Sequence, residues 1–446
     1  MTTTRVEREV ELEAAANVRR VPLRVALLGF GTVGQAIARI LLERTGLSSR
    51  LVLTHVFNRG VNRKRVSWTP ESVTWTERFD DVLAADPDIV VEAVGGVEPA
   101  YDWIRTVLSR GASVVTANKL LMAAHAPELI ALAAAHGGRI RFEAAVAGGI
   151  PIINAIRAGL AGDTLTSVTG ILNGTCNFIL SRMTSGDSMS AALEEAQRRG
   201  FAEADPTSDV DGHDAAAKLV LLAGVVFGRH VATMDVPTGS IRRIDAVDFR
   251  YAKRLGSTIR QLSMVEWAGN GQLQAFVGPA LVSLDSSFAR NKGAQNLVML
   301  TGKYGGATTF SGEGAGGNPT AVAIVSDLLA LTRRDRRTAP VDATWLPGQI
   351  VRPHPRSYYL RFVVKDRPGI LAAITAALAR HGINVDAVLQ EPGFPKDHLP
   401  FVVTVEPCEE AALQDALHDV TDESFHAEAP LVLPVLPGED HAAAVQ

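Results

Sequence analysis

The sequence is poor in cysteine, in long apolar runs and in any excess of one charge. Cys176 and Cys408 are the only cysteines, so no disulfide framework is expected and a reducing cytoplasm is the expected compartment. No stretch offers about 18 uninterrupted apolar residues, and residues 1–20 lack the apolar segment of a signal peptide, so we expect neither a membrane span nor an anchor and interpret 1–20 as a flexible extension. A net charge of −4, spread along the chain, predicts no nucleic-acid partner.

Composition and length indicate a folded protein of several domains. Apolar residues make up 47% of the chain and charged residues 21%, which is typical of a globular protein with a substantial core. The 446 residues correspond to about three domains. Over residues 21–149, apolar runs such as RVALLGF, LVLTHVF and PDIVVEAVG alternate with helical patterns. This alternation predicts a parallel sheet with helices on both faces.

The remainder of the chain divides into further blocks. Helical patterns at 190–199 and 212–228 mix with strand-like runs such as SVTGIL and QLQAFVGPALV. The predicted parts are an α+β substrate-binding or oligomerisation domain at 150–319, a helix at 320–339 that returns to the first domain, a proline-rich linker at 340–356, a βαββαβ unit at 357–432 and a tail at 433–446.

A glycine motif follows the first apolar strand. Gly29 allows a tight turn, Gly31 allows the backbone to approach a pyrophosphate, and Gly34 allows the next helix to pack closely on the strand. The helix N-terminus then offers N–H groups and a positive dipole end to phosphates. A glycine-rich turn without a ligand is the alternative, but the strand before and the helix after are the context that a dinucleotide site requires. The motif therefore predicts an oxidoreductase that uses a nicotinamide cofactor.

The end of the second predicted strand bears on the choice of cofactor. An acidic residue there would bind the ribose 2′-hydroxyl of NAD, but the chain has Asn58 and Arg59, with Arg63, Lys64 and Arg65 close by. Basic side chains suit a 2′-phosphate, so we expect NADP to be favoured, with NAD possible. The alternative is that these basic side chains only keep a surface loop solvated and do not bind the cofactor.

Two lysines stand in settings that suggest chemistry. Lys119 follows an apolar strand, at the sheet edge where ligands bind in such folds, although a solvated lysine is an equal alternative. Lys218 shares a helix face with Asp214, four residues earlier. A surface ion pair worth about 0.3–0.5 kcal/mol is the simpler interpretation. The apolar neighbours instead predict a confined, carboxylate-lined site, which suits an acid–base lysine.

An acidic stretch precedes Lys218. Glu203, Asp205, Asp209, Asp211 and Asp214 lie within twelve positions. A calcium loop is one alternative, but the EF-hand spacing and its closing glutamate are missing. We expect an anionic pocket that receives a substrate ammonium group.

Six longer strings are specific enough to compare with a known family. They are VVEAVGG (90–96), VVTANK (114–119), FEAAVAGGIPII (142–153), GILNGTCNFIL (170–180), GFAEADPTSDVDGHDAAAK (200–218) and GEGAGGNPTA (312–321). Together they resemble the homoserine dehydrogenase family from about residue 23 to 420. The resemblance implies an α/β fold with a Rossmann-type doubly wound parallel sheet, an α+β catalytic and oligomerisation domain and a small C-terminal βαββαβ ACT domain.

The resemblance implies a reaction and roles for residues. The reaction is the reversible reduction of L-aspartate 4-semialdehyde to L-homoserine by NAD(P)H, in threonine, methionine and isoleucine biosynthesis. Lys218 is implied as the proton donor and Lys119 as the residue between nicotinamide and substrate, where it contacts both. Glu203 is implied to bind the substrate amino group, and Asp209 and Asp214 to support the pocket.

The resemblance also implies further binding positions. Gly316, in a returning glycine-rich loop, is implied to close over the cofactor, and Phe30, Thr32 and Val33 belong to the phosphate loop with the three glycines. The family has a monovalent-cation site, usually sodium, made of one carboxylate and three carbonyls. The matching positions are Glu143, Val146, Gly148 and Ile150.

The last block resembles an ACT domain through DRPGIL (366–371). It keeps Asp366, Gly369 and Asn384, but has Val405-Glu406-Pro407 where many members have Thr-His. The positions that are kept imply L-threonine as an effector at this domain, whereas the altered positions weaken that implication. Because ACT modules commonly pair, we expect a homodimer or homotetramer.

Two other functions compete with this interpretation. A semialdehyde dehydrogenase that oxidises through a thioester needs a cysteine nucleophile beside a base, and the motif around Cys176 has no such base. The other is an amino-acid sensor that binds a cofactor but catalyses no reaction. The presence of Lys119, Glu203, Asp214 and Lys218 together argues against it.

Overall fold

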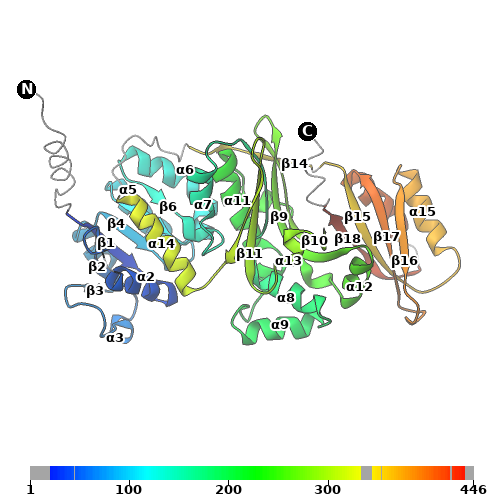
Figure 1. The fold of residues 1–446 in the computed structure, drawn as a ribbon, viewed down its shortest axis with the longest axis horizontal. Helices are drawn as coiled ribbons and strands as arrows, with labels where there is room; N and C mark the ends of the chain where they lie inside the picture. Colours follow the sequence, from blue (N-terminus) through cyan, green and yellow to red (C-terminus); the bar gives the residue numbers. More distant parts are fainter. Residues whose placement is uncertain (1–20, 45, 333–343, 353, 422–423, 437–446) are drawn as a thin grey trace, which may run out of the picture. The chain divides into compact units, whose positions relative to one another are not determined.

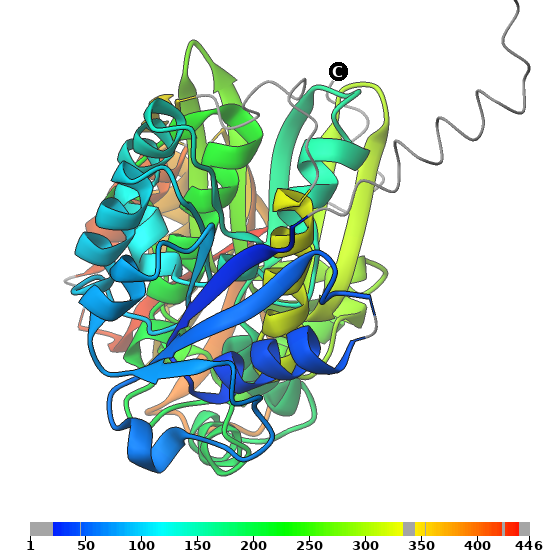
Figure 2. The ribbon, with the colours of Figure 1, turned by 90° about the vertical axis from the view of Figure 1, so that its left-hand side faces the viewer.

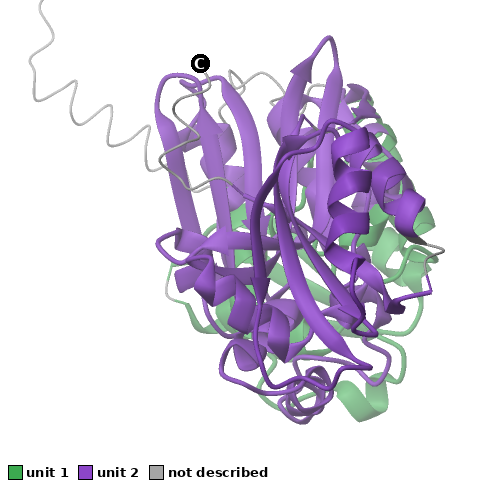
Figure 3. Cartoon of the chain, turned by 90° about the vertical axis from the view of Figure 1, so that its right-hand side faces the viewer, with its two compact units in different colours: residues 1–121, 128–144, 316–341 green, residues 122–127, 145–315, 342–446 purple. Residues whose placement is uncertain are grey.

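The computed structural model describes residues 21–44, 46–332, 344–352, 354–421 and 424–436. The predicted extension at 1–20 and most of the predicted tail lie outside these residues. The chain divides into two compact units (Figure 3). Unit 1 comprises residues 1–121, 128–144 and 316–341, and unit 2 comprises residues 122–127, 145–315 and 342–446.

Unit 1 contains a six-stranded sheet in the order β3-β2-β1-β4-β5-β6 (Figure 1). All of its neighbouring strands are parallel. The strands are β1 (Leu23–Leu28), β2 (Leu51–Phe57), β3 (Thr74–Thr76), β4 (Ile89–Glu92), β5 (Ser113–Thr116) and β6 (Ile140–Arg141). The predicted parallel sheet is confirmed. Its strand order reverses between β1 and β4, which is where dinucleotides bind in such folds.

Helices alternate with these strands along the chain. They are α2 (Thr32–Glu43), α3 (Val61–Lys64), α4 (Phe79–Ala84), α5 (Ala100–Ser109), α6 (Lys119–Ala135) and α14 (Gly317–Leu331). The returning helix α14 lies beside α2 on one face of the sheet (Figure 2), where Ile37 and Ile324 belong to one buried core with Val25 and Leu27 of β1. The predicted return helix at 320–339 is thus present over 317–331, and 333–339 lies outside the described residues.

Unit 2 contains one large sheet in the order β12-β11-β7-β9-β10-β18-β15-β17-β16, with β14 also paired to β10. Its strands are β7 (Leu165–Ile171), β9 (Ser257–Gly269), β10 (Gln272–Ser283), β11 (Gln295–Gly302), β12 (Gly306–Glu313), β14 (Gln349–Val351), β15 (Arg356–Val364), β16 (Val385–Gln390), β17 (Leu399–Cys408) and β18 (His426–Val435). A separate two-stranded sheet joins β8 (Arg229–His230) to β13 (Leu346–Pro347).

The α-helices of unit 2 are α7 (Ile152–Asn154), α8 (Gly174–Thr184), α9 (Met189–Arg198), α10 (Thr207–Val210), α11 (His213–Phe227), α12 (Ala246–Arg254), α13 (Ser287–Arg290), α15 (Ile370–Arg380) and α16 (Glu410–Thr421). Of these, α11 is almost entirely apolar. Glycines in the left-handed region, Gly212 and Gly228, flank α11, which explains why it begins and ends there. Within the described ranges, no helix has both the length and the apolar character needed to cross a membrane.

The C-terminal block has the element order β15-α15-β16-β17-α16-β18, so the predicted βαββαβ unit is confirmed. One face of its sheet packs on α15 and α16. The other face contributes Tyr359, Val402 and Leu431 to a core shared with Phe178 of α8 and Tyr251 of α12. This block and the middle block therefore share both a sheet and a core.

The structure adds strands where a linker and a tail were predicted. Within the predicted linker 340–356, β13 and β14 pair with β8 and β10, and Trp345 is buried against Gly224 of α11. Within the predicted tail 433–446, β18 extends to Val435 and pairs with Leu281 of β10. Proline density predicted irregular backbone over the linker, but the short strand β13 accommodates Pro347.

Candidate active site

The glycine turn joins β1 to α2 in unit 1. Gly29 has φ +97°, and a Cβ there would lie 2.6 Å from the carbonyl oxygen of Ala93, so no other residue fits this turn. A Cβ at Gly31 would meet nothing within 4 Å, which leaves the space that a pyrophosphate needs. No side chain caps the N-terminus of α2, and its first turn holds no acidic residue. The turn is therefore built to receive an anion.

The ends of β4 and β5 form a cavity beside this turn. It has a volume of about 180 Å³ and is lined by Val33, Glu92, Ala93, Val94, Gly95, Ala117 and Asn118. The buried Glu92 carboxylate accepts hydrogen bonds from the backbone N–H groups of Val94 (2.8 Å) and Gly95 (3.0 Å) and from the Thr116 hydroxyl. Glu92 thus orders the strand end, a role that the sequence did not suggest. Lys119, half-buried, is the first residue of α6 beside Asn118, which caps that helix.

Asn58, at the end of β2, supports the glycine turn. Its Oδ1 accepts a hydrogen bond from the Phe30 backbone N–H at 3.0 Å, and the Phe30 ring is buried in the core. Arg59, Arg63 and Lys64 are exposed beyond it, and so is Arg65. Among the described residues, no carboxylate forms an ion pair with these four bases. This loop therefore presents positive charge at the strand end where a ribose binds in such folds.

Gly316 directly precedes α14 in unit 1. It has φ +123°, a conformation that glycine adopts readily, and it is the N-cap residue of the helix. A Cβ on the next residue, Gly317, would lie 2.9 Å from the Thr32 side chain of α2. The returning loop therefore lies next to the phosphate turn within this unit.

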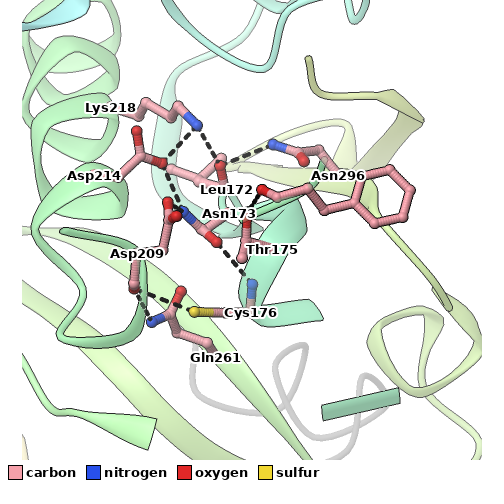
Figure 4. Close-up of polar contacts among 10 residues, drawn as sticks. Leu172, Asn173, Thr175, Cys176, Asp209, Asp214, Lys218, Gln261 and Asn296 are labelled. Atoms are coloured by element: carbon pink, nitrogen blue, oxygen red, sulfur yellow. Dashed lines mark hydrogen bonds and ion pairs between the residues drawn. The ribbon is translucent and has the colours of Figure 1, made fainter. Parts of the chain in front are cut away.

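The Lys218 ammonium is held at two points in unit 2 (Figure 4). Its Nζ donates to Oδ2 of Asp214 and to the backbone carbonyl of Leu172, both at 2.8 Å. The side chains are only 13% and 9% exposed for Lys218 and Asp214, respectively. The pair is therefore largely shielded from water, which supports the confined site predicted from the sequence over a solvated surface pair.

The predicted acidic cluster does not converge as a whole. Asp211 binds Arg242, whose guanidinium lowers the pKa of Asp211, and Asp205 is exposed and accepts from the Thr207 backbone N–H. Glu203 is exposed on the loop before α10. Only Asp209 and Asp214 are brought together, by a shared partner.

Asn173 is that shared partner, and sequence reasoning did not identify it. Its Nδ2 donates to Oδ1 of Asp209 at 2.7 Å and to Oδ2 of Asp214 at 2.8 Å. Its Oδ1 caps α8 by accepting from the Cys176 backbone N–H. Asparagine before a helix is a recognisable cap in a sequence, but its second role depends on tertiary structure.

Cys176 is fully buried in the same cluster. Its thiol donates to the Asp209 backbone carbonyl, with 3.1 Å between sulfur and oxygen. Burial, together with the nearby carboxylates of Asp209 and Asp214, raises the pKa of the Cys176 thiol well above its usual value. A thiol that stays protonated is a poor nucleophile, so this cysteine does not suit thioester chemistry.

The positions expected to bind a cation lie on both sides of the point where the chain passes from unit 1 to unit 2. Glu143 is buried, and its backbone N–H donates to Oδ2 of Asp327. Ala147 and Gly148 both have positive φ, and a Cβ at Gly148 would lie 2.5 Å from the Gly314 carbonyl oxygen. Among the described residues, no group of three His, Cys, Asp or Glu side chains is placed to hold a metal.

Models of three known families match the chain: homoserine dehydrogenase, NAD binding domain, at 29–143; homoserine dehydrogenase at 151–329; and ACT domain at 358–420. A homoserine dehydrogenase from Synechocystis is 37% identical over 434 residues, which cover 93% of this chain and 99% of that protein. The crystal structure of a homoserine dehydrogenase from Thiobacillus denitrificans has a TM-score of 0.85 at 34% identity and covers 93% of this chain and 98% of that one. A hyperthermophilic archaeal homoserine dehydrogenase in complex with NADPH has a TM-score of 0.60 at 26% identity, over 71% of this chain and all of that one.

Proposed function

From the premise that the chain belongs to the homoserine dehydrogenase family, we propose that Lys218 is the proton donor in the reduction of L-aspartate 4-semialdehyde to L-homoserine. The chain is an NAD(P)-dependent oxidoreductase that acts on a CH–OH group. The observation that supports the assignment is the shielded Lys218 ammonium, oriented by Asp214 and the Leu172 carbonyl. NADP-dependent oxidation of L-homoserine, followed by absorbance of the reduced cofactor, tests the activity itself.

The residues divide the work of the reaction. The nicotinamide, when bound, supplies the hydride. Lys218 gives its proton to the carbonyl oxygen as the alkoxide develops, and takes it back in the reverse direction. Asp214 orients the ammonium, while Asp209 and the exposed Glu203 are proposed to bind the substrate ammonium group. For Lys119 we propose contact with the cofactor and the substrate carbonyl, as the family resemblance implies.

We propose NADP as the preferred cofactor. The residue after β2 is an amide, Asn58, already bonded to Phe30, and Arg59 is exposed beside it without an acidic partner in the described chain. A hydrogen bond to a charged group contributes about 1.5–3 kcal/mol. The ratio of kcat/KM for NADPH over NADH should therefore be about 10–100.

Arg59→Ala should lower that ratio about tenfold and leave kcat/KM for NADH unchanged. Arg50→Ala, an exposed arginine just before the amino end of the same strand, is the matched control. A wild-type enzyme that prefers NADH would refute the proposal, as would an equal loss with both cofactors.

We propose a monovalent cation, Na⁺, at Glu143, Val146, Gly148 and Ile150. The buried Glu143 carboxylate and the constrained turn at Ala147–Gly148 support this donor set. Activity in sodium chloride should exceed that in choline chloride at equal ionic strength. Equal activity in the two salts contradicts the proposal.

We propose that L-threonine lowers activity through the ACT block. Asp366 is exposed in the turn before α15, where its Oδ2 lies 3.6 Å from Nζ of the exposed Lys396, and Gly369 is the N-cap residue of that helix, without a side-chain cap. This turn offers a carboxylate for an ammonium group and N–H donors for a carboxylate, which are the two charges of an amino acid. Deleting the block is an unsuitable test, because Tyr359 and Val402 share a core with α8.

Point variants avoid that difficulty. Asp366→Ala should raise the L-threonine concentration for half-inhibition about tenfold, the value of one charged hydrogen bond, with kcat retained. Asp415→Ala, another exposed carboxylate of the same block, should leave inhibition unchanged. A wild-type enzyme that L-threonine does not inhibit excludes this effector.

A further inference from the structure

The side chain of Asn173 makes three hydrogen bonds at the centre of the Lys218 cluster. It is 3% exposed and lies between β7 and α8. Both of its N–H donors bind carboxylates, those of Asp209 and Asp214, and its oxygen binds the Cys176 N–H (Figure 4).

Chemistry fixes the orientation of this amide. Ionised carboxylates only accept hydrogen bonds, and a backbone N–H only donates. Turning the amide over would direct its oxygen at Asp209 and Asp214 and its NH₂ group at the Cys176 N–H, so all three contacts would become repulsive. The NH₂ group therefore faces the carboxylates.

The same contacts determine where Lys218 points. Oδ2 of Asp214 accepts from both Asn173 Nδ2 and Lys218 Nζ, each at 2.8 Å. The preceding residue, Leu172, supplies the carbonyl that is the second acceptor of Nζ, and Asn296 Nδ2 donates to that same carbonyl at 2.9 Å. Two consecutive residues thus hold the ammonium: one directly, the other through Asp214.

We propose that Asn173 is a positioning residue for the reaction, which keeps Asp209 and Asp214 ionised side by side and thereby orients the Lys218 ammonium. The proposal rests on the proposed role of Lys218 as proton donor. Asn173 touches neither the reacting atoms nor the cofactor in this scheme; it acts through the two carboxylates.

The charged and titratable groups around the amide determine what its loss does. They include Asp209 on α10, Asp214 and Lys218 on α11, and Cys176 on α8, with Asp211 nearby but bound to Arg242. Two neighbouring carboxylates without a shared donor raise the pKa of one of them. Protonated Asp214 no longer pairs with Lys218, and protonated Asp209 no longer attracts a substrate ammonium. Either change lowers activity on the acid side.

Asn173→Ser separates this role from helix capping, because serine is also a good N-cap residue. We expect kcat/KM for L-homoserine to fall about 10–100-fold and its acid limb to move up by about one pH unit. NADPH affinity should stay close to wild type, and the loss of two hydrogen bonds to carboxylates should lower the melting temperature by a few degrees. Asn173→Gly also keeps a tolerated N-cap residue and should show the same loss of kcat/KM and the same shift of the acid limb. It replaces the serine variant if that variant folds poorly. Ser188→Ala removes the cap of α9 and controls for the loss of a cap alone.

Each outcome discriminates. A lower kcat/KM with a shifted acid limb supports the proposal. Unchanged activity, or a loss without a shift of the acid limb, overturns it and leaves the role of Lys218 intact. If wild type does not oxidise L-homoserine, or if Lys218→Ala stays active, the proposed function fails and this proposal fails with it.

Discussion

Lys218→Ala should lower kcat about 10²–10⁴-fold, because removing a general acid leaves the developing alkoxide without a proton. The Lys218 ammonium is the group that Asp214 and the Leu172 carbonyl orient, in a site with little exposure to water. NADPH affinity should survive, since the phosphate turn at Gly29–Gly34 belongs to unit 1 and Lys218 to unit 2. Steady-state rates and cofactor titration measure the two effects separately.

Two companion variants sharpen this test. Lys218→Arg keeps the positive charge beside the buried Asp214, yet arginine does not release a proton in the working pH range, so this variant should fold normally and remain impaired. Lys253→Ala, at an exposed position on α12, should retain full activity. Near wild-type turnover by both Lys218 variants would refute the assignment.

Arg361→Met should lower the free energy of unfolding by about 3–5 kcal/mol, because it leaves a buried carboxylate without its counter-charge. Nη1 of Arg361, on β15, lies 2.7 Å from Oδ2 of Asp248 on α12, and the two side chains are 5% and 0% exposed. Tyr359 donates to the other oxygen of Asp248 at 2.8 Å. Denaturant unfolding of wild type and variant gives the difference.

The loss should depend on pH. Burial raises the pKa of Asp248 even though Arg361 opposes that shift. A folded-state pKa above the unfolded value means that stability falls as pH rises through it. Without Arg361 the deficit should therefore be larger at pH 7 than in acid, where protonated Asp248 needs no counter-charge.

Controls for this pair come from the same block and the same contact. Arg380→Ala breaks an exposed pair with Asp419 and should change stability little. Asp248→Asn combined with Arg361→Met should recover part of the loss, because no lone charge is then buried. A small effect of Arg361→Met at every pH would contradict the argument.

The sequence predicted the parts of the site that rest on local patterns. Gly29, Gly31 and Gly34 predict a phosphate-binding turn, because only glycine lets the backbone turn tightly and approach a phosphate. Asp214 and Lys218 share a helix face because they are four residues apart. Both conclusions depend on one element and its immediate neighbours, so periodicity and spacing are enough to reach them.

Contacts between distant elements could not be predicted in this way. The Leu172 carbonyl belongs to the main chain, so the residue type at this position does not indicate that it binds Lys218. From the sequence, Asn173 is recognisable only as a helix cap. Asp211 resembled its acidic neighbours until Arg242, 31 residues later, was seen to bind it. Arg361 within the apolar run YYLRFVV signals that some buried acid must exist, but the run does not say which of 48 acidic residues it is.

The pairing of β18 with β10 has a consequence for synthesis on the ribosome. Leu281 of β10 pairs with Val435, which is 435 − 281 = 154 residues further along the chain. At about 5–20 residues per second, the ribosome adds this stretch in roughly 8–30 s. Until then, part of the β10 edge stays unpaired in the nascent chain, and unpaired strand edges are where chains associate wrongly. The last strand of the described chain is thus the one that joins β10 to β15 within the sheet.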